Sequence, residues 1–243
     1  MLRHDYAVAA AAAIREPLAD RFRAFPPHPV GVVNAVRCTT ALALRAWLRL
    51  YHRMEIVGRE NLPRHRSFVM VANHSSHLDA LCMLSALPLR SLGTTYPAAA
   101  EDYFFVNLPR MAAARIFVNA LPFSRQGHVR QSLNLCRRLL RQQGNVLILF
   151  PEGTRSAGGE LGEFRPGIAG VVAGLDVPVV PCAVVGAARA LPKGRLIPRP
   201  RQLRLIIGIS RTYAELEPGK DSSRHIIRDL HDAVKELLCA PVS

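Results

Sequence analysis

The chain has 243 residues, enough to bury a hydrophobic core without disulfides, and nothing in its composition requires a second domain. Its formal net charge of +14 comes almost wholly from arginine, because Lys193, Lys220 and Lys235 are the only lysines among the 32 basic residues. Arginine binds phosphate through a planar fork of donors, so an anionic partner is expected, with a general bias toward arginine as the alternative. Aromatic residues are scarce at 6% and no nucleic-acid motif occurs, which argues against nucleic acid as that partner.

The five cysteines lie in apolar stretches with no close pair, at positions 38, 82, 136, 182 and 239. This spacing predicts free thiols in a reducing compartment and disfavours a zinc or disulfide framework. No convincing secretory signal is present, and arginines interrupt the apolar stretches before the roughly 18 residues that a membrane span needs. We therefore expect a cytoplasmic protein without a transmembrane helix.

A proline-rich hinge at residues 25–29 separates a first helical piece from a helix predicted at about 33–53. At about 100° per residue, the arginines of this helix fan over one side and an apolar set occupies much of the other. The arginines are Arg37, Arg45, Arg49 and Arg53, and the apolar set is Val36, Ala43, Ala46, Trp47, Leu50 and Tyr51. Such a helix is typical of a membrane interface, but a surface helix that packs Trp47 against the domain has the same pattern. We predict that residues 1–53 form an N-terminal helical, membrane-interface segment and residues 54–243 the main domain.

From residue 54 onward, strand-like and helix-like segments alternate. Strands are predicted at 68–72, 115–118, 146–150, 179–185 and 203–209, and helices at 78–87, 128–143, 167–175 and along a final apolar stripe at 226–238. Ser222 or Asp221 is the expected cap of the last helix. The alternation predicts an α/β fold: a single domain with a mainly parallel central sheet flanked by helices, plus the N-terminal helical extension. In such sheets ligands gather at the carboxyl ends of the strands.

Two polar runs follow apolar strand candidates directly. The first is Asn73-His74-Ser75-Ser76-His77-Leu78-Asp79. His74 can accept a proton at neutral pH if its tautomer is fixed, and Asp79 can orient the ring by accepting a hydrogen bond from it. The sequence has no G-x-S-x-G elbow and no cysteine in a distinctly polar setting, so the pair is expected to activate a hydroxyl of the substrate.

Two other interpretations of this run remain open. His74 and Asp79 could belong to an ordinary turn and helix start, because their spacing is common by chance. His74, His77 and Asp79 could also bind a metal, although no second cluster supplies the remaining ligands, and we regard His77 as a spacer.

The second run is Phe150-Pro151-Glu152-Gly153-Thr154-Arg155, which continues into a glycine-containing stretch. Gly153 permits close approach of the backbone to a ligand, Thr154 offers a hydroxyl, and Arg155 can bind phosphate. Glu152 would bind a hydroxyl or orient Arg155. A solvent-exposed turn is the alternative, and the absence of a G-x4-G-K-[ST] loop argues against a nucleoside triphosphate.

Together the two runs resemble the glycerolipid acyltransferase family, typified by 1-acylglycerol-3-phosphate acyltransferase. Residues 73–79 look like its first motif, N-H-x4-D, and residues 150–156 match its third, F-P-E-G-T-R-S. Residues 119–125, Asn-Ala-Leu-Pro-Phe-Ser-Arg, resemble the second motif, residues 177–181 the fourth, and residues 164–167, Phe-Arg-Pro-Gly, the segment after the third. Order and spacing agree from about residue 57 to 186.

The resemblance implies that His74 is the general base and Asp79 its partner. The acceptor hydroxyl would attack the thioester of an acyl-CoA or acyl-carrier-protein donor, without a metal or other cofactor. The resemblance assigns binding of the acceptor phosphate to Arg125, Glu152, Gly153, Thr154 and Arg155.

Two departures from the family pattern bear on the acceptor and on membrane access. Ser124 stands where many members carry aspartate, and Asn119 where glycine is frequent, so the acceptor can differ from lysophosphatidate. N-terminal transmembrane segments, which several members have, are not evident, so Trp47, its apolar neighbours and the arginines are expected to provide peripheral contact with the cytoplasmic face of a membrane.

The leading hypothesis is therefore an O-acyltransferase acting on a lysophospholipid. The same chemistry on another lipid, a glycolipid or a secondary metabolite is the first alternative. A metal-dependent hydrolase and a non-catalytic membrane-binding protein are the others.

Overall fold

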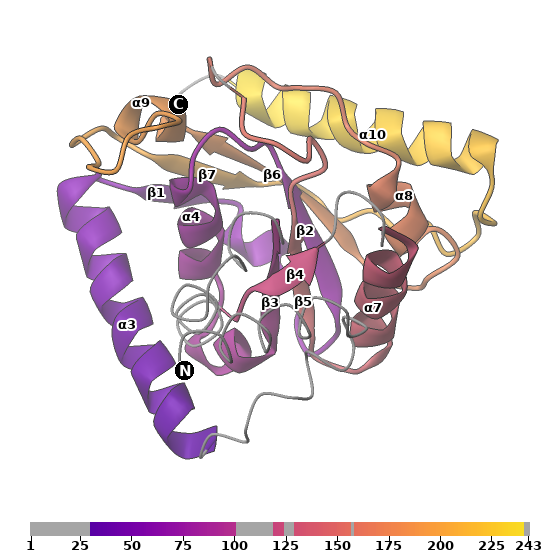
Figure 1. The fold of residues 1–243 in the computed structure, drawn as a ribbon, viewed down its shortest axis with the longest axis horizontal. Coiled ribbons are helices and arrows are strands. Elements are labelled where there is room, and N and C mark those ends of the chain that lie inside the picture. Colours follow the sequence, from indigo (N-terminus) through magenta and orange to yellow (C-terminus); the bar gives the residue numbers. More distant parts are fainter. Residues whose placement is uncertain (1–29, 101–118, 124–128, 157, 241–243) are drawn as a thin grey trace, which may run out of the picture.

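Seven strands form one sheet in the order β1-β7-β6-β2-β5-β3-β4 (Figure 1). The computed structural model describes residues 30–100, 119–123, 129–156 and 158–240. The strands are β1 (Glu55–Val57), β2 (Phe68–Ala72), β3 (Thr95–Ala100), β4 (Leu121–Phe123), β5 (Val146–Leu149), β6 (Val179–Val185) and β7 (Arg204–Ile207). Five of them, β6, β2, β5, β3 and β4, run parallel, whereas β7 is antiparallel to β6 and β1 is parallel to β7. The predicted α/β fold with a mainly parallel sheet is confirmed.

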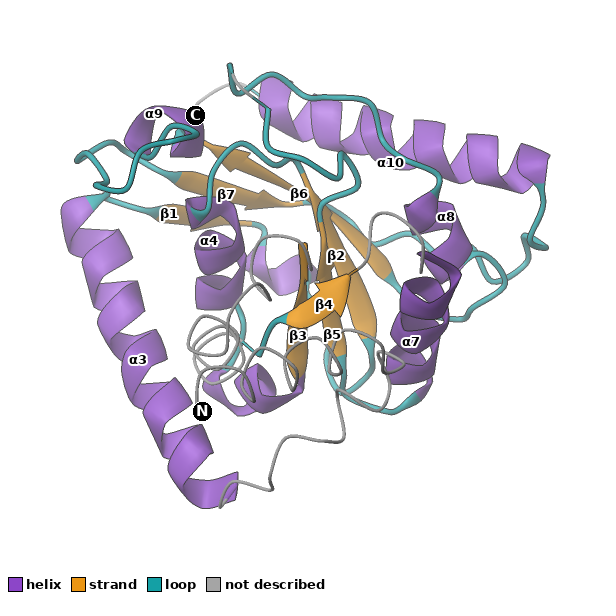
Figure 2. Ribbon diagram, viewed as in Figure 1, coloured by secondary structure: helices purple, strands orange, loops and turns teal. Residues whose placement is uncertain are grey.

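Helices cover both faces of this sheet (Figure 2). One face carries α3 (Val30–Tyr51), α4 (Leu78–Ala86), the 3-10 helix η2 (Leu89–Thr94) and α9 (Ala187–Ala190), and the other carries α7 (Val129–Arg141), α8 (Gly167–Val172) and α10 (Lys220–Cys239). A second 3-10 helix, η1 (Arg59–Asn61), follows β1. Side chains of β2 alternate between the two resulting cores, with Met70 in the first and Val69 and Val71 in the second. A strand covered on both faces is apolar throughout, which is why all five residues of β2 are buried.

The long apolar segments were predicted well. Strands β2 and β6 have the predicted bounds, β5 ends one residue earlier, and β7 lies inside its predicted range. Strands β1, β3 and β4 were missed, because β1 and β4 are three residues long and β3 is an alanine-rich segment with a proline. The predicted strand at 115–118 and the hinge at 25–29 lie outside the described residues.

The predicted cap of the last helix is wrong. Helix α10 begins at Lys220 after Gly219, and no side chain caps it by a hydrogen bond. Asp221 lies in the first turn instead, where its negative charge interacts favourably with the helix dipole.

Helix α3 has a packed side and an outward side, and they match the predicted sides only in part. Leu48 is 1% exposed and belongs to the first core, and Trp47 packs against the same core and stacks on Tyr51 at 5.7 Å. Arg37 donates a hydrogen bond to Asn119 Oδ1 at 3.2 Å, and Arg45 donates one to the Leu87 carbonyl. Two of the four arginines thus face the domain. Trp47 also packs on the domain, as expected for the alternative to a membrane-interface helix, namely a surface helix.

The outward side of α3 is mainly apolar, although Thr39 and Arg49 are also exposed on this helix. Its exposed residues include Val36, Leu42, Ala43, Ala46 and Leu50, which we call the outer stripe. Leu42 is 54% and Leu50 79% exposed. Because α3 packs on α4 and η2, the described part of the N-terminal segment is joined to the domain. The boundary at residue 53 stays a prediction.

Candidate active site

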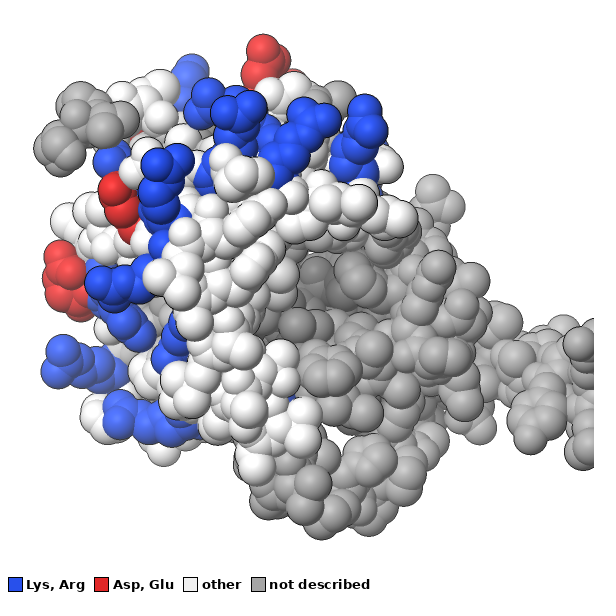
Figure 3. All heavy atoms as spheres, turned by 90° about the vertical axis from the view of Figure 1, so that its left-hand side faces the viewer, with Lys and Arg blue, Asp and Glu red and all other residues white. Residues whose placement is uncertain are grey.

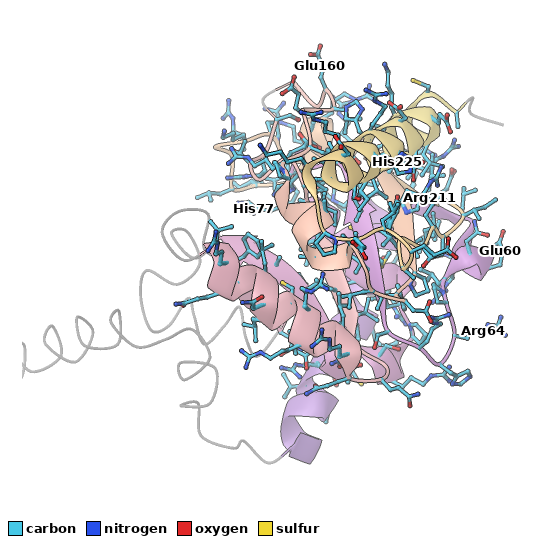
Figure 4. The ribbon with its side chains drawn as sticks, turned by 90° about the vertical axis from the view of Figure 1, so that its right-hand side faces the viewer. Glu60, Arg64, His77, Glu160, Arg211 and His225 are labelled. Atoms are coloured by element: carbon cyan, nitrogen blue, oxygen red, sulfur yellow. The ribbon has the colours of Figure 1, made fainter. Side chains whose placement is uncertain are left out.

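The two polar runs meet at one edge of the sheet. Strands β2 and β5 are neighbours and parallel, with Val71 beside Leu149, so the chain leaves both strands at the same edge. Figure 4 shows His77, from the run after β2, on the opposite side of the molecule from Glu60 and Arg64, which precede β2. The site therefore lies at the carboxyl ends of the parallel strands, where α/β sheets bind ligands.

His74 and Asp79 form a hydrogen-bonded pair. His74 Nδ1 lies 3.0 Å from Asp79 Oδ2, and the two side chains are 18% and 0% exposed. The same carboxylate oxygen accepts the backbone N–H groups of Ser75 at 2.6 Å and Ser76 at 2.8 Å. Three donors thus fix the carboxylate, which sits in the first turn of α4.

This arrangement gives the imidazole a defined role. Asp79 accepts a hydrogen bond from Nδ1–H, so Nε2 carries the lone pair that can take a proton. The aspartate also stabilises the imidazolium that forms afterwards. The pair is equipped for general base catalysis on a hydroxyl placed at Nε2.

Glu152 holds the backbone of His74. Its Oε1 accepts the His74 backbone N–H at 2.6 Å, its Oε2 accepts that of Gly162 at 3.1 Å, and the residue is 6% exposed. Burial raises the pKa of this carboxyl, against the lowering effect of the two backbone hydrogen bonds. Both oxygens of Glu152 are thus engaged inside the protein.

Two further contacts join the third motif to His74. The Ser156 N–H donates to the His74 carbonyl at 2.8 Å, and the Phe150 ring stacks on the imidazole at 4.2 Å. The ring, the N–H and the carbonyl of His74 are therefore all held by other residues.

The turn after β5 requires glycine at position 153. Gly153 has a φ of +71°, and a Cβ there would come within 2.8 Å of Arg165 Nε. That nitrogen donates to the Glu152 carbonyl at 3.1 Å, so the arginine also fixes the turn. Thr154 follows as an exposed residue, and Arg155 is partly exposed. The structure thus gathers His74, Asp79 and residues 152–155 at one edge; Arg125 lies outside the described residues.

Asn73 is a site residue to which sequence reasoning gave no role. Its side chain accepts from the Val184 N–H at 2.8 Å and donates to the Val184 carbonyl at 3.0 Å. These bonds tie the end of β2 to β6 just before His74, and Asn73 is 3% exposed. An amide directly after a fully apolar strand is the signal that could have indicated this role, because a buried amide needs partners.

Asn119 explains one departure from the family pattern. Its φ is +53°, a left-handed conformation that glycine and asparagine adopt most readily. Its side chain donates to the carbonyls of Gly93 and Thr95 at 3.2 and 3.1 Å. Asparagine therefore replaces glycine without loss of the backbone conformation.

His77 lies beside the pair but in a different electrostatic setting. Burial, Arg155 and His74 lower its pKa from the ordinary value of 6.5 to about 4, so it is neutral at physiological pH. Within the described ranges, no group of three or more His, Cys, Asp or Glu side chains is arranged to hold a metal ion.

The chain is similar to known acyltransferases. Residues 53–185 match the family model named Acyltransferase. A chloroplastic 1-acyl-sn-glycerol-3-phosphate acyltransferase of Brassica napus is 34% identical over 147 residues, which cover 59% of this chain and 40% of the relative. The human 1-acyl-sn-glycerol-3-phosphate acyltransferase alpha is 29% identical over 129 residues, covering 53% and 44%. The crystal structure of the 1-acyl-sn-glycerophosphate acyltransferase PlsC from Thermotoga maritima superposes with a TM-score of 0.64 at 21% identity, covering 98% of this chain and 90% of that one.

The similarity to PlsC shows a shared α/β fold. The family model covers more than half of the residues, and the chain therefore belongs to the acyltransferase family. The chain spans about two fifths of the length of the first curated relatives that it matches.

Proposed function

We propose that this protein transfers a fatty acyl chain from a thioester donor to a hydroxyl of a lysophospholipid, such as 1-acylglycerol-3-phosphate. The observation that carries the proposal is the His74–Asp79 pair, oriented at the carboxyl edge of the sheet with the third motif bound to its backbone. The curated relatives named as 1-acyl-sn-glycerol-3-phosphate acyltransferases support this class of acceptor.

Three of the five described cysteines are unsuited to act as a nucleophile of the enzyme. Cys82, Cys136 and Cys182 are fully buried, and burial raises the pKa of each thiol, to about 12 for Cys136. Such groups stay protonated and are poor nucleophiles. In the proposed mechanism the attacking group is the acceptor hydroxyl.

The proposed reaction has two steps. His74 Nε2 takes the proton of the acceptor hydroxyl while the oxygen of that hydroxyl bonds to the thioester carbonyl carbon. This step gives a tetrahedral intermediate. The intermediate then collapses, the C–S bond breaks, and the thiolate of CoA or of acyl-carrier protein takes the proton from His74. The products are an ester and a free thiol, and no metal or other cofactor takes part.

The acceptor phosphate is assigned to the residues beyond the turn after β5. Thr154 offers an exposed hydroxyl, Arg155 a guanidinium whose charge helps to lower the pKa of His77, and Arg125 keeps the phosphate-binding role that the family resemblance implies. Glu152 leaves this group, because both of its oxygens hold backbone N–H groups. Its role in the proposal is to position His74.

The acceptor is a membrane lipid, so the protein is proposed to associate peripherally with the cytoplasmic face of a membrane. The outer stripe of α3 provides an exposed apolar surface for this contact. None of the helices in the described residues has the length and apolar character to cross a bilayer.

The test is thiol release from palmitoyl-CoA. Release should require lysophosphatidate, and His74→Ala should lower the rate by roughly three orders of magnitude or more while leaving the circular dichroism spectrum unchanged. His225→Ala, on the exposed surface of α10, is the matched control and should keep the native rate. An unchanged rate in His74→Ala would refute the mechanism, and equal rates with non-phosphorylated acceptors would refute the acceptor assignment.

A further inference from the structure

The segment between α9 and β7 combines exposed aliphatic side chains with a high density of positive charge. Leu196 is 91% and Ile197 81% exposed, the two highest values among the large hydrophobic residues that are described. Residues 192–201 read Pro-Lys-Gly-Arg-Leu-Ile-Pro-Arg-Pro-Arg, with four cationic side chains, all exposed, and no acidic one. We call this segment the basic–apolar loop.

Hydrogen bonds anchor the loop at both ends, and they fix the position of its tip. The Arg199 N–H donates to the Ala190 carbonyl at 2.8 Å, and the Arg195 N–H donates to the Pro192 carbonyl at 3.0 Å. His52 Nδ1 lies 3.0 Å from the Arg201 carbonyl, to which it donates. These bonds hold the backbone on either side of Leu196 and Ile197.

The loop also adjoins α3. Tyr51, the last residue of α3, donates from its hydroxyl to the Pro198 carbonyl at 3.0 Å. Figure 1 shows the segment after α9, in orange, beside the C-terminal end of α3. Leu50, the last residue of the outer stripe, is exposed on the last turn of α3, at the end of the helix that adjoins the loop.

The same loop begins at the catalytic edge. Ser76 Oγ donates to the Leu191 carbonyl at 2.8 Å, and Lys193 Nζ donates to the Arg155 carbonyl at 3.4 Å. Strand β7 is antiparallel to β6, so its first residue, Arg204, lies opposite Val185 at the carboxyl edge. The loop thus projects from the edge of the sheet that carries His74.

Charge and apolarity together indicate the partner. Figure 3 shows the α3 side of the molecule, where Lys and Arg gather across the top and along one edge beside an uncharged band, with few Asp or Glu. An anionic membrane surface attracts the cations and, in the same contact, removes the aliphatic side chains from water. Proline on both sides of Arg199 and the anchoring bonds reduce the freedom that the loop would lose on binding.

We propose that the basic–apolar loop inserts Leu196 and Ile197 into the surface of an anionic bilayer and, with the outer stripe of α3, holds the His74 site at the level of the lipid headgroups. The inference rests on the proposed function in one respect, namely that the acceptor resides in the membrane. It adds a second docking element, in the C-terminal half of the chain, to the N-terminal helix.

The test is co-sedimentation of the full chain with vesicles of phosphatidylcholine and phosphatidylglycerol. Leu196→Asp with Ile197→Asp should weaken binding by roughly tenfold or more, because the two side chains that enter the bilayer surface become charged. Ile209→Asp is the matched control: Ile209 is 76% exposed, but it follows β7 at the opposite edge of the sheet, so binding should remain native. Native binding by the double variant, or an equal loss in the control, would overturn the proposal.

A second pair of variants tests the cations. Arg195→Glu with Arg199→Glu should weaken binding to the mixed vesicles strongly and binding to pure phosphatidylcholine little, and added salt should reduce the difference. Equal losses on both kinds of vesicle would contradict the electrostatic part of the proposal. If the charge variants bind vesicles normally and lose binding to an acidic acyl-carrier protein, the partner is that protein and the membrane assignment is wrong.

Thiol release with a short-chain, monomeric lysophosphatidate separates this inference from the proposed function. The aspartate double variant should keep the native rate with this acceptor and lose rate only when the acceptor is embedded in vesicles; a loss on both would overturn the docking role. His74→Ala should bind vesicles like the native chain. If His74→Ala retains turnover while the loop variant fails to bind, the proposed chemistry is wrong and the docking surface stands.

Discussion

His74 is held by contacts to its side chain and to its backbone. Asp79 fixes the ring, whereas Glu152 and Ser156 hold the amide and the carbonyl of the same residue. The base of the proposed mechanism needs both kinds of contact, because a small displacement of the main chain would move Nε2 away from the proton of the acceptor hydroxyl.

Glu152 provides a direct test of positioning against acceptor binding. Glu152→Ala removes two backbone hydrogen bonds from a buried site and should reduce kcat roughly tenfold to a hundredfold, with little change in KM for the acceptor. Glu152→Gln keeps one acceptor oxygen, so its kcat should lie between that of Glu152→Ala and that of the native protein. Steady-state kinetics with varied lysophosphatidate measures both constants.

The exposed Glu160 on the neighbouring loop offers the matched control (Figure 4). Glu160→Gln should leave both constants unchanged. A rise in KM without a fall in kcat for the Glu152 variants would show instead that this carboxylate binds the acceptor.

His77 makes the stability of the fold sensitive to acid. Its pKa is about 4 in the folded protein and near 6.5 in the unfolded chain, so between these values the unfolded state binds more protons. Stability is therefore lost as the pH falls from about 6.5 toward 4. His77→Asn should lose less stability than the native chain between pH 7 and pH 5, by on the order of 1–2 kcal/mol.

Urea unfolding at the two pH values measures this difference. His225→Asn, at an exposed position on α10, should behave like the native chain and serves as the control. An equal loss of stability in native and His77→Asn proteins would show that His77 titrates normally in the fold.

At the scale of elements, α3 uses its two sides for different purposes. Leu48 is 1% and Leu50 79% exposed, two residues apart on the same helix. Leu48→Ala should destabilise the protein by about 2–4 kcal/mol, because it leaves a cavity in the first core. Leu50→Ala should change stability by less than about 0.5 kcal/mol.

Thermal or urea unfolding measures the stability of both variants, and co-sedimentation with vesicles measures their membrane binding. Leu50→Ala should weaken binding, whereas Leu48→Ala should bind normally under conditions in which it is folded. The assignment of the two sides of α3 fails if Leu50→Ala destabilises as much as Leu48→Ala.

The orientation of α3 also shows what a helical pattern leaves open. Arginine and leucine occur on both of its sides, so periodicity alone could not decide which side packs. The decision depends on partners distant in sequence, such as the Asn119 side chain and the Leu87 carbonyl, which bind Arg37 and Arg45. Strand β3 was missed for a related reason, since its pairing with β5 outweighs the weak strand preference of its alanines.

At the scale of the whole molecule, the sheet accounts for what sequence reasoning did predict. Apolar runs followed directly by polar runs predicted strands β2 and β5. Because parallel strands end at a common edge of the sheet, His74 and Asp79 were expected to lie close to residues 152–155, and they do. Their individual roles were harder to predict, because the bonds of Asn73 to β6 and of Glu152 to His74 and Gly162 exist only after folding. The basic–apolar loop had no periodic pattern to reveal it, and its exposure and its position beside α3 are properties of the assembled fold.

The hydrogen bond between Glu152 and His74 spans 78 residues, and this separation bears on the order of events during synthesis. His74 and Asp79 emerge from the ribosome almost together, but the strand that completes their surroundings follows much later. A nascent or truncated chain that ends before residue 152 carries the acid–base pair without its backbone support. Full turnover is therefore expected only after residue 152 has been added and β5 has docked on β2.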